Sequence, residues 1–585
     1  MFETQQKIIT VSLFGVFLTL FVSLFNLQIF KGSQYKEIAE KNYVRILPIQ
    51  PVRGEIFDRK YRPIVENKPS YNLYLTPGKI HNKNKIIEFI SGNFEISHNK
   101  VSEILYKNRF RLYNEILIIQ DLDYEKVVDI SEDLNFYPAI EIKPENSRKY
   151  VYNNHFSGYV GKINESEFAI LKDSDYNLNS LIGKTGLEDQ YETILRGKKG
   201  YNILQVDSGG KNLGFFKHNL QQSPMNGDDL ILTIDNDLQH GISSIFPKDI
   251  KGCAIVSDIT TGEILAYVSK PDFDPNIFVG NISNEEWSSI LANKNKPMLD
   301  RVIHGTYPPG SIYKPIIATL ALTENVIDKR SKLHDCTGGM QFGNRFFKCW
   351  FESGHGRTNV ISAIKYSCDV FFYDLSDEFT LEQIDNHTKQ NFVTIKTGID
   401  LPGERKGFFP TDAWFRKNYG KYVSITGHKV NLSIGQGEVL VSPLQMCAYY
   451  AALANNGVWK QPHLLKNTAS NSYEAKINEK HLPVDTKNLE IIQNALFKTV
   501  NEKYGTGTAA SMKNIKVYGK TGSAENHMGK TTHAWFAGYA TWENPEIAFT
   551  VFMENAGHGG SIAAPFAAKV IQLYAEFRQN DAKNP

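Results

Sequence analysis

Several serines in this sequence stand three positions before a lysine, a spacing that could let the lysine accept the serine's proton. The spacing recurs, among other places, at Ser97, Ser208, Ser311 and Ser362. Only Ser311 follows Pro-Pro-Gly and precedes an apolar run with helical spacing, in PPGSIYKPIIATLAL. Because a proline such as Pro315 fits a helix only in its first turn, Ser311 is predicted at the start of a helix. Lys314 then lies one turn further on the same face.

This pair could carry out nucleophilic catalysis. A serine hydroxyl is a poor nucleophile until a base accepts its proton, and an uncharged amine one turn away can be that base. A lysine has an ordinary pKa near 10.4, so a base working at about pH 7.5 requires a lowering of about 3 units, or about 4 kcal/mol. Burial, the positive end of a helix and a second cation all lower a lysine pKa. We hypothesise that Lys314 is the base and that Lys520 is the second cation.

The tripeptide Lys-Thr-Gly occurs at Lys184, Lys396 and Lys520. After Lys184 the residues LEDQYETILRG have helical spacing, and IDLPGE after Lys396 predicts a turn, so both copies have structural explanations. Lys520 instead ends a predicted strand, where Gly522 would let another backbone approach closely. A phosphate-binding loop is unsupported, because no Gly-Lys-Thr here has the earlier glycine of G-x-x-x-x-G-K-[ST].

A third polar group is Ser367 with Asp369 in KYSCDVFFYDL, which we predict on a helix. Taken singly, each residue has an ordinary explanation: Ser311 as a helix cap, Ser367 as a helix hydroxyl, and Lys520 as a surface charge. Taken together, in this order and in these predicted elements, they favour one catalytic site.

The elements that must position these residues form an α+β pattern. GCAIVSDITTGEILAYVSKP predicts a hairpin, and NIKVYGKTGSAE, HAWFAGYATW and EIAFTVFMENA predict three later strands before a closing helix. Helical patterns fill the interval, so we expect a sheet interrupted by a helical insertion. Pro, Gly and Asn in QQSPMNGDD predict a domain boundary near residue 225, after a region of short strands and helices.

An apolar stretch near the N-terminus predicts a membrane anchor. Residues 8–30 carry no formal charge over 23 residues, which is about 35 Å of helix and enough to cross a hydrocarbon core of about 30 Å. The run is too long for a cleaved signal peptide and no small-residue cleavage site follows it, so we predict a retained single-pass anchor. Lys7 before it and Lys31 after it leave the orientation open, since large domains cross regardless of nearby charge. The balance of 65 basic and 63 acidic residues gives no reason to expect nucleic acid.

Ser-x-x-Lys, Ser-x-Asn/Asp and Lys-Thr-Gly in this order resemble the motifs of the penicillin-interacting serine transferases and hydrolases. Over nearly its whole length the chain is similar to class B penicillin-binding proteins of the elongation type, the penicillin-binding protein 2 subgroup. The stretches that carry this resemblance are the anchor, VRGEIFDRKYRPI, LIGKTGLEDQYETILRGKKG, LTIDNDLQ, PPGSIYK, SCDVFFY, NLSIGQGEVLVSPLQM and GKTGSAE. The resemblance implies a cytoplasmic tail and anchor (residues 1–33), an elongated α+β pedestal that is non-catalytic and dimerisation-like (34–225), and a transpeptidase domain (226–585) with a central antiparallel sheet flanked by helices.

The resemblance also implies an activity, the D,D-transpeptidation of peptidoglycan stem peptides during cell elongation, with β-lactams as acylating mimics of the substrate. Ser311 would be acylated with Lys314 as its base, and Ser367 and Lys520 would relay protons. The residues that would bind the substrate are Asp369, Thr521, Gly522 and Ser523. The N–H groups of Ser311 and Ser523 would form the oxyanion hole. Asp369 stands where most relatives carry Asn, which resembles the elongation subgroup. An ionised Asp cannot donate a hydrogen bond as an amide does.

The same resemblance implies a RodA-like glycan polymerase and the elongation machinery as partners, no cofactor for catalysis, and a single-pass position in the bacterial inner membrane with the catalytic domain in the periplasm. Two alternatives stay open. One is a D,D-carboxypeptidase or β-lactamase of the same fold, although no feature supplies a deacylating water. The other is a β-lactam sensor or a non-catalytic scaffold. The lifetime of the penicillin acyl-enzyme and a cross-linking assay would separate them.

Four residues of one stretch could bind a metal: Cys336, Cys349, His355 and Cys368. Three thiolates and one imidazole form a closed tetrahedral zinc set, and a structural zinc would brace the loop beside the catalytic helix. The alternatives are buried apolar cysteines or a disulfide between Cys336 and Cys349. Some elongation-type relatives carry metal ligands at similar spacings, which favours zinc. Cys253 and Cys447 stay outside this set.

Overall fold

The computed structural model describes residues 2–36, 44–110, 112, 114–171, 176, 180–206, 212–215, 221–280, 282–333, 335–473, 476–526 and 531–583. The chain forms two compact units. The first comprises Met1–Gly54, Pro69–Ser147 and Arg196–Gly227, and the second comprises Glu55–Lys68, Arg148–Leu195 and Asp228–Pro585. The chain therefore passes between the units several times, and two strands, β3 (Pro63–Leu75) and β5 (Ile140–Tyr150), have residues in both.

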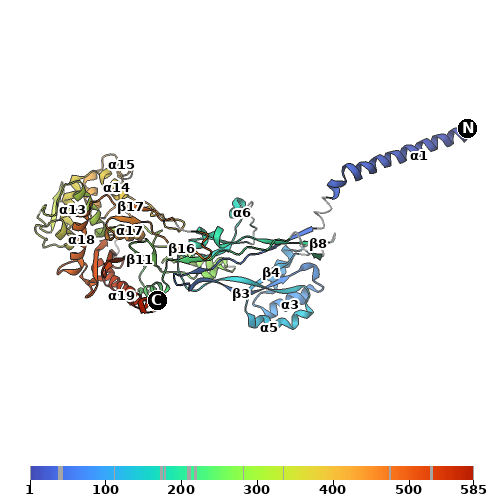
Figure 1. Ribbon diagram of the computed structural model, residues 1–585, viewed down its shortest axis with the longest axis horizontal. Coiled ribbons are helices and arrows are strands. Elements are labelled where there is room, and N and C mark those ends of the chain that lie inside the picture. The colour runs from blue at the N-terminus through green and yellow to red at the C-terminus, as the bar shows by residue number, and fades with distance from the viewer. Residues whose placement is uncertain are drawn as a thin grey trace. The chain divides into compact units, whose positions relative to one another are not determined.

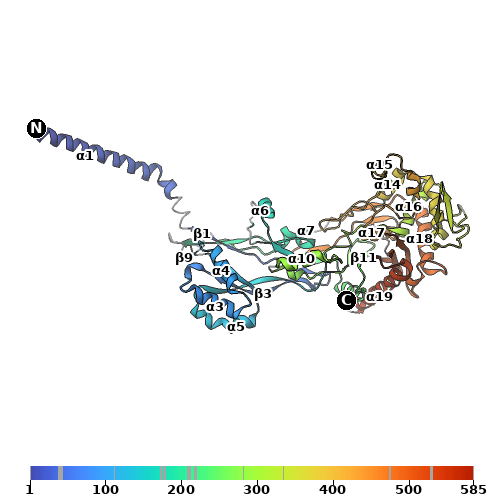
Figure 2. The same ribbon diagram turned by 180° about the vertical axis from the view of Figure 1, so that it is seen from behind.

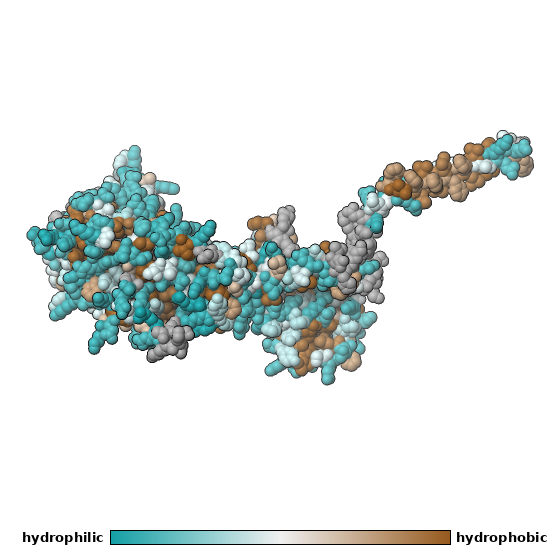
Figure 3. Space-filling view, viewed as in Figure 1, coloured by the Kyte–Doolittle hydropathy of each residue, from teal (hydrophilic) through white to brown (hydrophobic). Residues whose placement is uncertain are grey.

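The first unit begins with an apolar helix. α1 (Phe2–Phe25) continues through a π-helical turn, η1 (Asn26–Phe30), and none of its residues is buried. The segment Phe2–Phe30 has 29 residues and a mean hydropathy of 2.5 in its most apolar part, so it is long and apolar enough to cross a membrane. Figure 3 shows a largely apolar surface along this helix. Among the described residues it is the only helix of this kind, and it fits a single-pass membrane anchor.

The remainder of the first unit mixes strands and helices. β1 (Val44–Ile49), β8 (Gly200–Val206) and β9 (Asn212–Phe215) form an antiparallel sheet in the order β1-β8-β9. The second part of β3 pairs with β4 (Ile116–Leu122), and α3 (Lys83–Asn93), α4 (His98–Lys107) and α5 (Tyr124–Ser131) lie beside these strands (Figures 1 and 2). Leu73, Ile90, Val101 and Ile130 belong to the buried cluster that joins these helices to the strands.

The second unit is built around a five-stranded antiparallel sheet in the order β12-β11-β20-β19-β18. Its strands are β11 (Gly252–Asp258), β12 (Ile264–Lys270), β18 (Lys516–Ala524), β19 (His533–Thr541) and β20 (Pro545–Met553). Alternate residues face opposite sides, so Val256 and Phe549 join one buried cluster while Ile255 and Phe552 join another. The first cluster includes α9 (Asn236–Ile245) and α19 (Ala564–Lys583), and the second includes α11 (Lys314–Thr323), α17 (Pro443–Ala454) and α18 (Thr486–Asn501).

A largely helical segment separates β12 from β18, as expected. Its further helices are α10 (Asn284–Ala292), α12 (Val360–Tyr366), α13 (Asp369–Leu375), α14 (Leu381–Gln390), α15 (Asp412–Tyr419) and α16 (Ile425–Ser433). It also contains the hairpin of β13 (Gly339–Phe342) and β14 (Arg345–Lys348), and the pair β15 (Val458–Lys460) and β17 (Glu479–His481). The predicted α+β fold with a central antiparallel sheet flanked by helices is confirmed, including the hairpin β11–β12 and the closing helix α19.

Smaller elements complete the second unit. β16 (Leu465–Thr468), β10 (Leu230–Leu232), β2 (Ile56–Phe57) and the first part of β3 form a second sheet. The short elements from 160 to 195 are β6 (Val160–Lys162), α6 (Glu165–Leu171), β7 (Leu181–Gly183), α7 (Gly186–Gln190) and α8 (Glu192–Leu195). The Lys-Thr-Gly copy at Lys184 therefore leads into a helix that begins at Gly186. The copy at Lys396 is followed by a turn at Pro402 and Gly403, and its Gly398 has a φ of 78°.

Candidate active site

The serine that follows Pro-Pro-Gly lies just before a helix. Ser311 belongs to a 3-10 turn, η6 (Gly310–Tyr313), and α11 begins at Lys314 with Pro315 in its first turn. Ser311 is half-buried, whereas Lys314 is fully buried. A buried ammonium group needs acceptors, because burying a charge without partners costs a large free energy.

Lys314 finds its acceptors in the Ser-x-Asp segment. Its Nζ donates to the Ser367 carbonyl at 2.8 Å and to Asp369 Oδ1 at 2.7 Å, and it lies 3.2 Å from Ser367 Oγ. Burial raises the pKa of Asp369, while the charge of Lys314 acts in the opposite direction. The second oxygen of this carboxylate accepts the Trp350 N–H at 3.0 Å.

The segment around Ser367 differs from the single helix that the sequence predicts. α12 ends at Tyr366, Ser367 has a left-handed φ of 57°, and Asp369 is the first residue of α13. A left-handed residue at a helix end frees carbonyl groups from the helical ladder. This break lets both the carbonyl and the hydroxyl of Ser367 face Lys314, which an uninterrupted helix would prevent.

Strand β18 packs closely against the turn that carries Ser311. A Cβ atom added to Gly522 would lie 2.8 Å from the Pro309 carbonyl oxygen, and one added to Gly310 would lie 3.0 Å from the Ser523 carbonyl oxygen. Glycine at both positions therefore permits the contact, and Gly310 also has a positive φ of 57°. The structure thus brings the third Lys-Thr-Gly segment beside Ser311.

Lys520, on this strand, is fully buried. Its Nζ donates to the Thr521 carbonyl at 3.2 Å. Burial lowers the pKa of Lys520 well below its usual value, the charge of Lys314 lowers it further, and Asp369 opposes both effects. The two lysines and the carboxylate therefore form one electrostatically coupled group in the interior of the second unit.

Three further residues, which were not predicted from the sequence, contact Thr521 and Ser523 on the strand of Lys520. The Thr521 hydroxyl donates to Thr506 Oγ1 at 2.8 Å, and Ser523 Oγ accepts the Gly559 N–H at 3.1 Å. The Ser523 carbonyl accepts Gln436 Nε2 at 2.9 Å. Gln436 lies in NLSIGQGEVLVSPLQM, one of the stretches of the family resemblance, whereas no sequence signal distinguishes Thr506 or Gly559.

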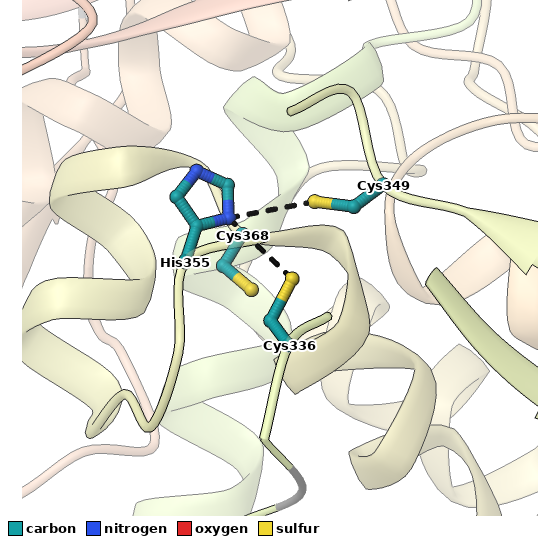
Figure 4. Close-up of side chains that lie close together, drawn as sticks. All are labelled: Cys336, Cys349, His355 and Cys368. Atoms are coloured by element: carbon teal, nitrogen blue, oxygen red, sulfur yellow. Dashed lines mark hydrogen bonds between the residues drawn. The ribbon is translucent and has the colours of Figure 1, made fainter. Parts of the chain in front are cut away.

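The four candidate metal ligands lie together (Figure 4). His355 Nδ1 is 3.6 Å from Cys336 Sγ and 3.5 Å from Cys349 Sγ, and the ligand atoms of all four residues, Cys368 included, lie within 4.8 Å of one another. Zn–S bonds of about 2.3 Å and a Zn–N bond of about 2.0 Å at tetrahedral angles would separate the ligand atoms by about 3.5–3.8 Å. The donor set and the two distances from His355 to the cysteines therefore fit zinc. All five cysteines of the chain are free thiols, so the structure has no Cys336–Cys349 disulfide.

The cysteine and histidine cluster adjoins the buried lysine group. The Asp369 N–H points at Cys349 Sγ at 3.4 Å, and Trp350, the next residue, donates to the Asp369 carboxylate. A hydrogen bond with Cys368 lowers the pKa of the Cys349 thiol, which favours a thiolate at this position. Cys253 and Cys447 are buried elsewhere, and Cys447 Sγ lies 3.5 Å from Ser257 Oγ.

Family models match two parts of the chain. Residues 252–572 match the penicillin binding protein transpeptidase domain, and residues 48–232 match the penicillin-binding protein dimerisation domain. The peptidoglycan D,D-transpeptidase MrdA of Haemophilus influenzae is 33% identical over 590 residues, which cover 96% of this chain and 89% of the relative.

Solved structures show the same relationship. The complex between penicillin-binding protein PBP2 and MreC from Helicobacter pylori contains a chain that matches with a TM-score of 0.80 at 27% identity. The match covers 91% of this chain and 99% of that one. A peptidoglycan synthase complex, described as coordinating polymerization and crosslinking, has a TM-score of 0.71 at 25% identity and covers 97% of this chain and 98% of its own. By its matched domains and its relatives, this chain belongs to the penicillin-binding protein transpeptidase family, in the PBP2 group.

Proposed function

We propose that this protein cross-links peptidoglycan stem peptides through a serine acyl-enzyme formed at Ser311. The observation that carries this proposal is the meeting of Ser311, the buried Lys314 and the Lys520 strand in one place. The chain is a peptidoglycan D,D-transpeptidase of cell elongation, as its transpeptidase domain and its MrdA relatives support. The relatives named above are transpeptidases and penicillin-binding proteins, which favours this activity over the carboxypeptidase and β-lactamase alternatives of the same fold.

In the proposed reaction, the Lys314 ammonium first passes a proton to the uncharged Lys520. Ser311 Oγ then attacks the carbonyl of the penultimate D-Ala of a stem peptide while Lys314 accepts its proton. The bond to the terminal D-Ala breaks, and a proton passes to the leaving amine. An amine of a neighbouring strand then attacks the ester, loses its proton, and restores the Ser311 hydroxyl. General base catalysis of this kind contributes about 10²–10⁴-fold to the rate. β-Lactams would acylate the same oxygen.

Proton transfer would pass through Ser367 and Lys520. Ser367 Oγ lies within hydrogen-bond distance of Lys314 Nζ. The lowered pKa of Lys520 favours an uncharged amine that can accept and return a proton. Repulsion between two neighbouring ammonium groups keeps one of them deprotonated, so each transfer at Ser311 has an acceptor nearby.

The strand edge would bind the substrate. Thr521 and Ser523 would hold the terminal carboxylate and the peptide backbone, and Gly522 would permit the close approach of the chain. The N–H groups of Ser311 and Ser523 would stabilise the oxyanion, and a donor of this kind contributes about 3–4 kcal/mol in the transition state. Asp369 would hold Lys314 in position through the hydrogen bond from Lys314 Nζ to Asp369 Oδ1.

We also propose a structural zinc held by Cys336, Cys349, His355 and Cys368. Transpeptidases of this family need no cofactor for catalysis, so the ion would not enter the reaction. Its tetrahedral bonds would instead fix the loop from which Trp350 donates to Asp369.

The remaining proposals concern organisation and partners. Residues 1–33 would be the cytoplasmic tail and anchor, 34–225 the pedestal, and 226–585 the transpeptidase domain, with the catalytic domain in the periplasm. The similarity to structures of PBP2 with MreC and of a peptidoglycan synthase complex supports the elongation machinery and a RodA-like glycan polymerase as partners.

Acylation tests the nucleophile. Labelled penicillin should add covalently to the peptide that contains Ser311, and Ser311→Ala should lose the adduct entirely, as mass spectrometry can show. Ser97→Ala, which removes another Ser-x-x-Lys hydroxyl, should keep it. A wild-type adduct that lasts for hours supports a transpeptidase, whereas hydrolysis within seconds, or an adduct on another side chain, would contradict the proposal.

The charge of Lys520 is tested by stability against pH. Between the lowered folded-state pKa and the ordinary value near 10.4, the unfolded chain binds more protons at this lysine than the folded chain, so wild-type stability rises with pH. Lys520→Met should therefore raise Tm by several degrees near pH 6.5, and this gain should shrink toward pH 9.5. The exposed Lys516→Met on the same strand is the control. A gain that is the same at both pH values would argue against the lowered pKa.

Metal analysis tests the zinc site. Full-length protein purified without chelator should contain about one zinc per chain, and His355→Ala or Cys336→Ser should lose most of it and lower Tm. Cys253→Ala should keep the metal, because Cys253 lies outside the cluster. Wild-type protein free of stoichiometric zinc, with a Tm unaffected by chelator, would remove this proposal.

Orientation and partnership can be tested in cells. Since the native cysteines are buried, a cysteine placed at the exposed Tyr422 should react with a membrane-impermeant maleimide from outside the inner membrane, whereas one at Phe2 should not. The reverse pattern would place the catalytic domain in the cytoplasm.

The same anchored protein should co-purify from detergent extracts with a glycan polymerase. Absence of the polymerase from such extracts would count against that partner.

A further inference from the structure

A glycine turn after α16 contacts both sides of the proposed oxyanion hole. Residues 434–437 follow the helix in the sequence IGQG. The Gly435 carbonyl accepts a hydrogen bond from the N–H of Gly310, the residue before Ser311, at 2.8 Å. Gly435 has a φ of 73°, and an added Cβ would lie 2.2 Å from the Gly310 carbonyl oxygen. The turn therefore contacts the backbone of the residue before Ser311, and only glycine fits at position 435.

The next residue bonds to the opposite side. Gln436 Nε2 donates to the Ser523 carbonyl at 2.9 Å, and Gln436 Oε1 accepts the Glu525 N–H at 3.1 Å. One side-chain amide thus makes the two bonds that a neighbouring strand would make to residues two apart on an edge. Because the N–H and C=O of a strand residue point to the same side, holding the Ser523 carbonyl also fixes the direction of the Ser523 N–H.

We propose that Gln436, together with Gly435, is a positioning element that sets the spacing between the N–H groups of Ser311 and Ser523. The inference rests on the proposed function, since only acyl transfer at Ser311 gives these N–H groups their role. Oxyanion donors act at about 2.7–3.1 Å from the developing charge, so a displacement of a few tenths of an ångström weakens them. The two sides approach so closely that a Cβ added to Gly310 would lie 3.0 Å from the Ser523 oxygen. This approach does not restrain the distance along the strand, whereas the Gln436 hydrogen bonds do.

The expected effect is on the chemical step and not on binding. In stopped-flow acylation of the full-length protein in detergent by a labelled penicillin, Gln436→Leu should lower the acylation rate constant about 10- to 100-fold. The dissociation constant of the non-covalent complex should change less than about threefold. Gln436→Glu keeps an acceptor for the Glu525 N–H but turns an oxygen toward the Ser523 carbonyl, so it should slow acylation to a similar extent.

A second glutamine provides a matched control. The Gln461 amide also bridges two parts of the backbone, donating to the Gly398 carbonyl and accepting from the Asn478 N–H. Gln461→Leu should leave both constants at wild-type values, and the Tm of every variant should be measured alongside. If Gln436→Leu does not fold, Gln436→Glu gives the same comparison with a nearly identical shape.

Each outcome decides the matter. A slower chemical step with unchanged binding in folded Gln436 variants supports the positioning role. Unchanged acylation in a folded variant overturns it, and so does an effect confined to the dissociation constant, which would make Gln436 a substrate-binding residue. If wild-type protein is not acylated at Ser311 at all, the proposed function fails, and this inference fails with it; acylated wild type with unaffected variants overturns this inference alone.

Discussion

The burial of two lysines around one carboxylate is the constraint on which the rest of the site depends. Lys314 and Lys520 are both fully buried, and Asp369 contacts the first directly. Removing two ammonium groups from water is costly unless each finds acceptors, and one carboxylate cannot neutralise both. Burial lowers the pKa of Lys520 most, and the charge of Lys314 lowers it further, since the one carboxylate does not offset both effects. In the proposed reaction this stability cost would have a chemical use, because an easily deprotonated amine can accept and return a proton.

Three segments far apart in the sequence must meet to build this interior, and glycine is what allows them to. The turn of Ser311, strand β18 and the 434–437 turn approach so closely that a Cβ at Gly310, Gly435 or Gly522 would lie 3.0 Å or less from a backbone oxygen of a neighbouring segment. Backbone contacts of this kind fix how closely the three segments approach one another. The Gln436 hydrogen bonds then restrain the position along β18.

Local patterns in the sequence predicted those parts whose cause is local. The proline after Ser311 marks a helix start, alternation marks β18 to β20, and cysteine and histidine spacing marks the candidate metal cluster. The left-handed Ser367 was not predicted, because its conformation is stabilised by the distant Lys314, and KYSCDVFFY reads as one helix on its own. Gln436 and Thr506 contact β18 across 87 and 15 positions, and no periodicity links them to it. The repeated passage of the chain between two units is likewise invisible to a linear pattern.

The aspartate of the second motif, where an amide would be expected, is explained by the donors around it. One oxygen of Asp369 accepts from Lys314, and the other accepts from the Trp350 N–H. Both neighbours are donors, so the position requires two acceptors, which a carboxylate supplies and an amide does not. An asparagine would turn its NH₂ group toward either the ammonium or the backbone N–H, and a buried donor facing a donor is unsatisfied. Because Trp350 follows Cys349, the same carboxylate connects Lys314 to the cysteine and histidine cluster, so that a fixed position of the cluster also fixes the position of Lys314.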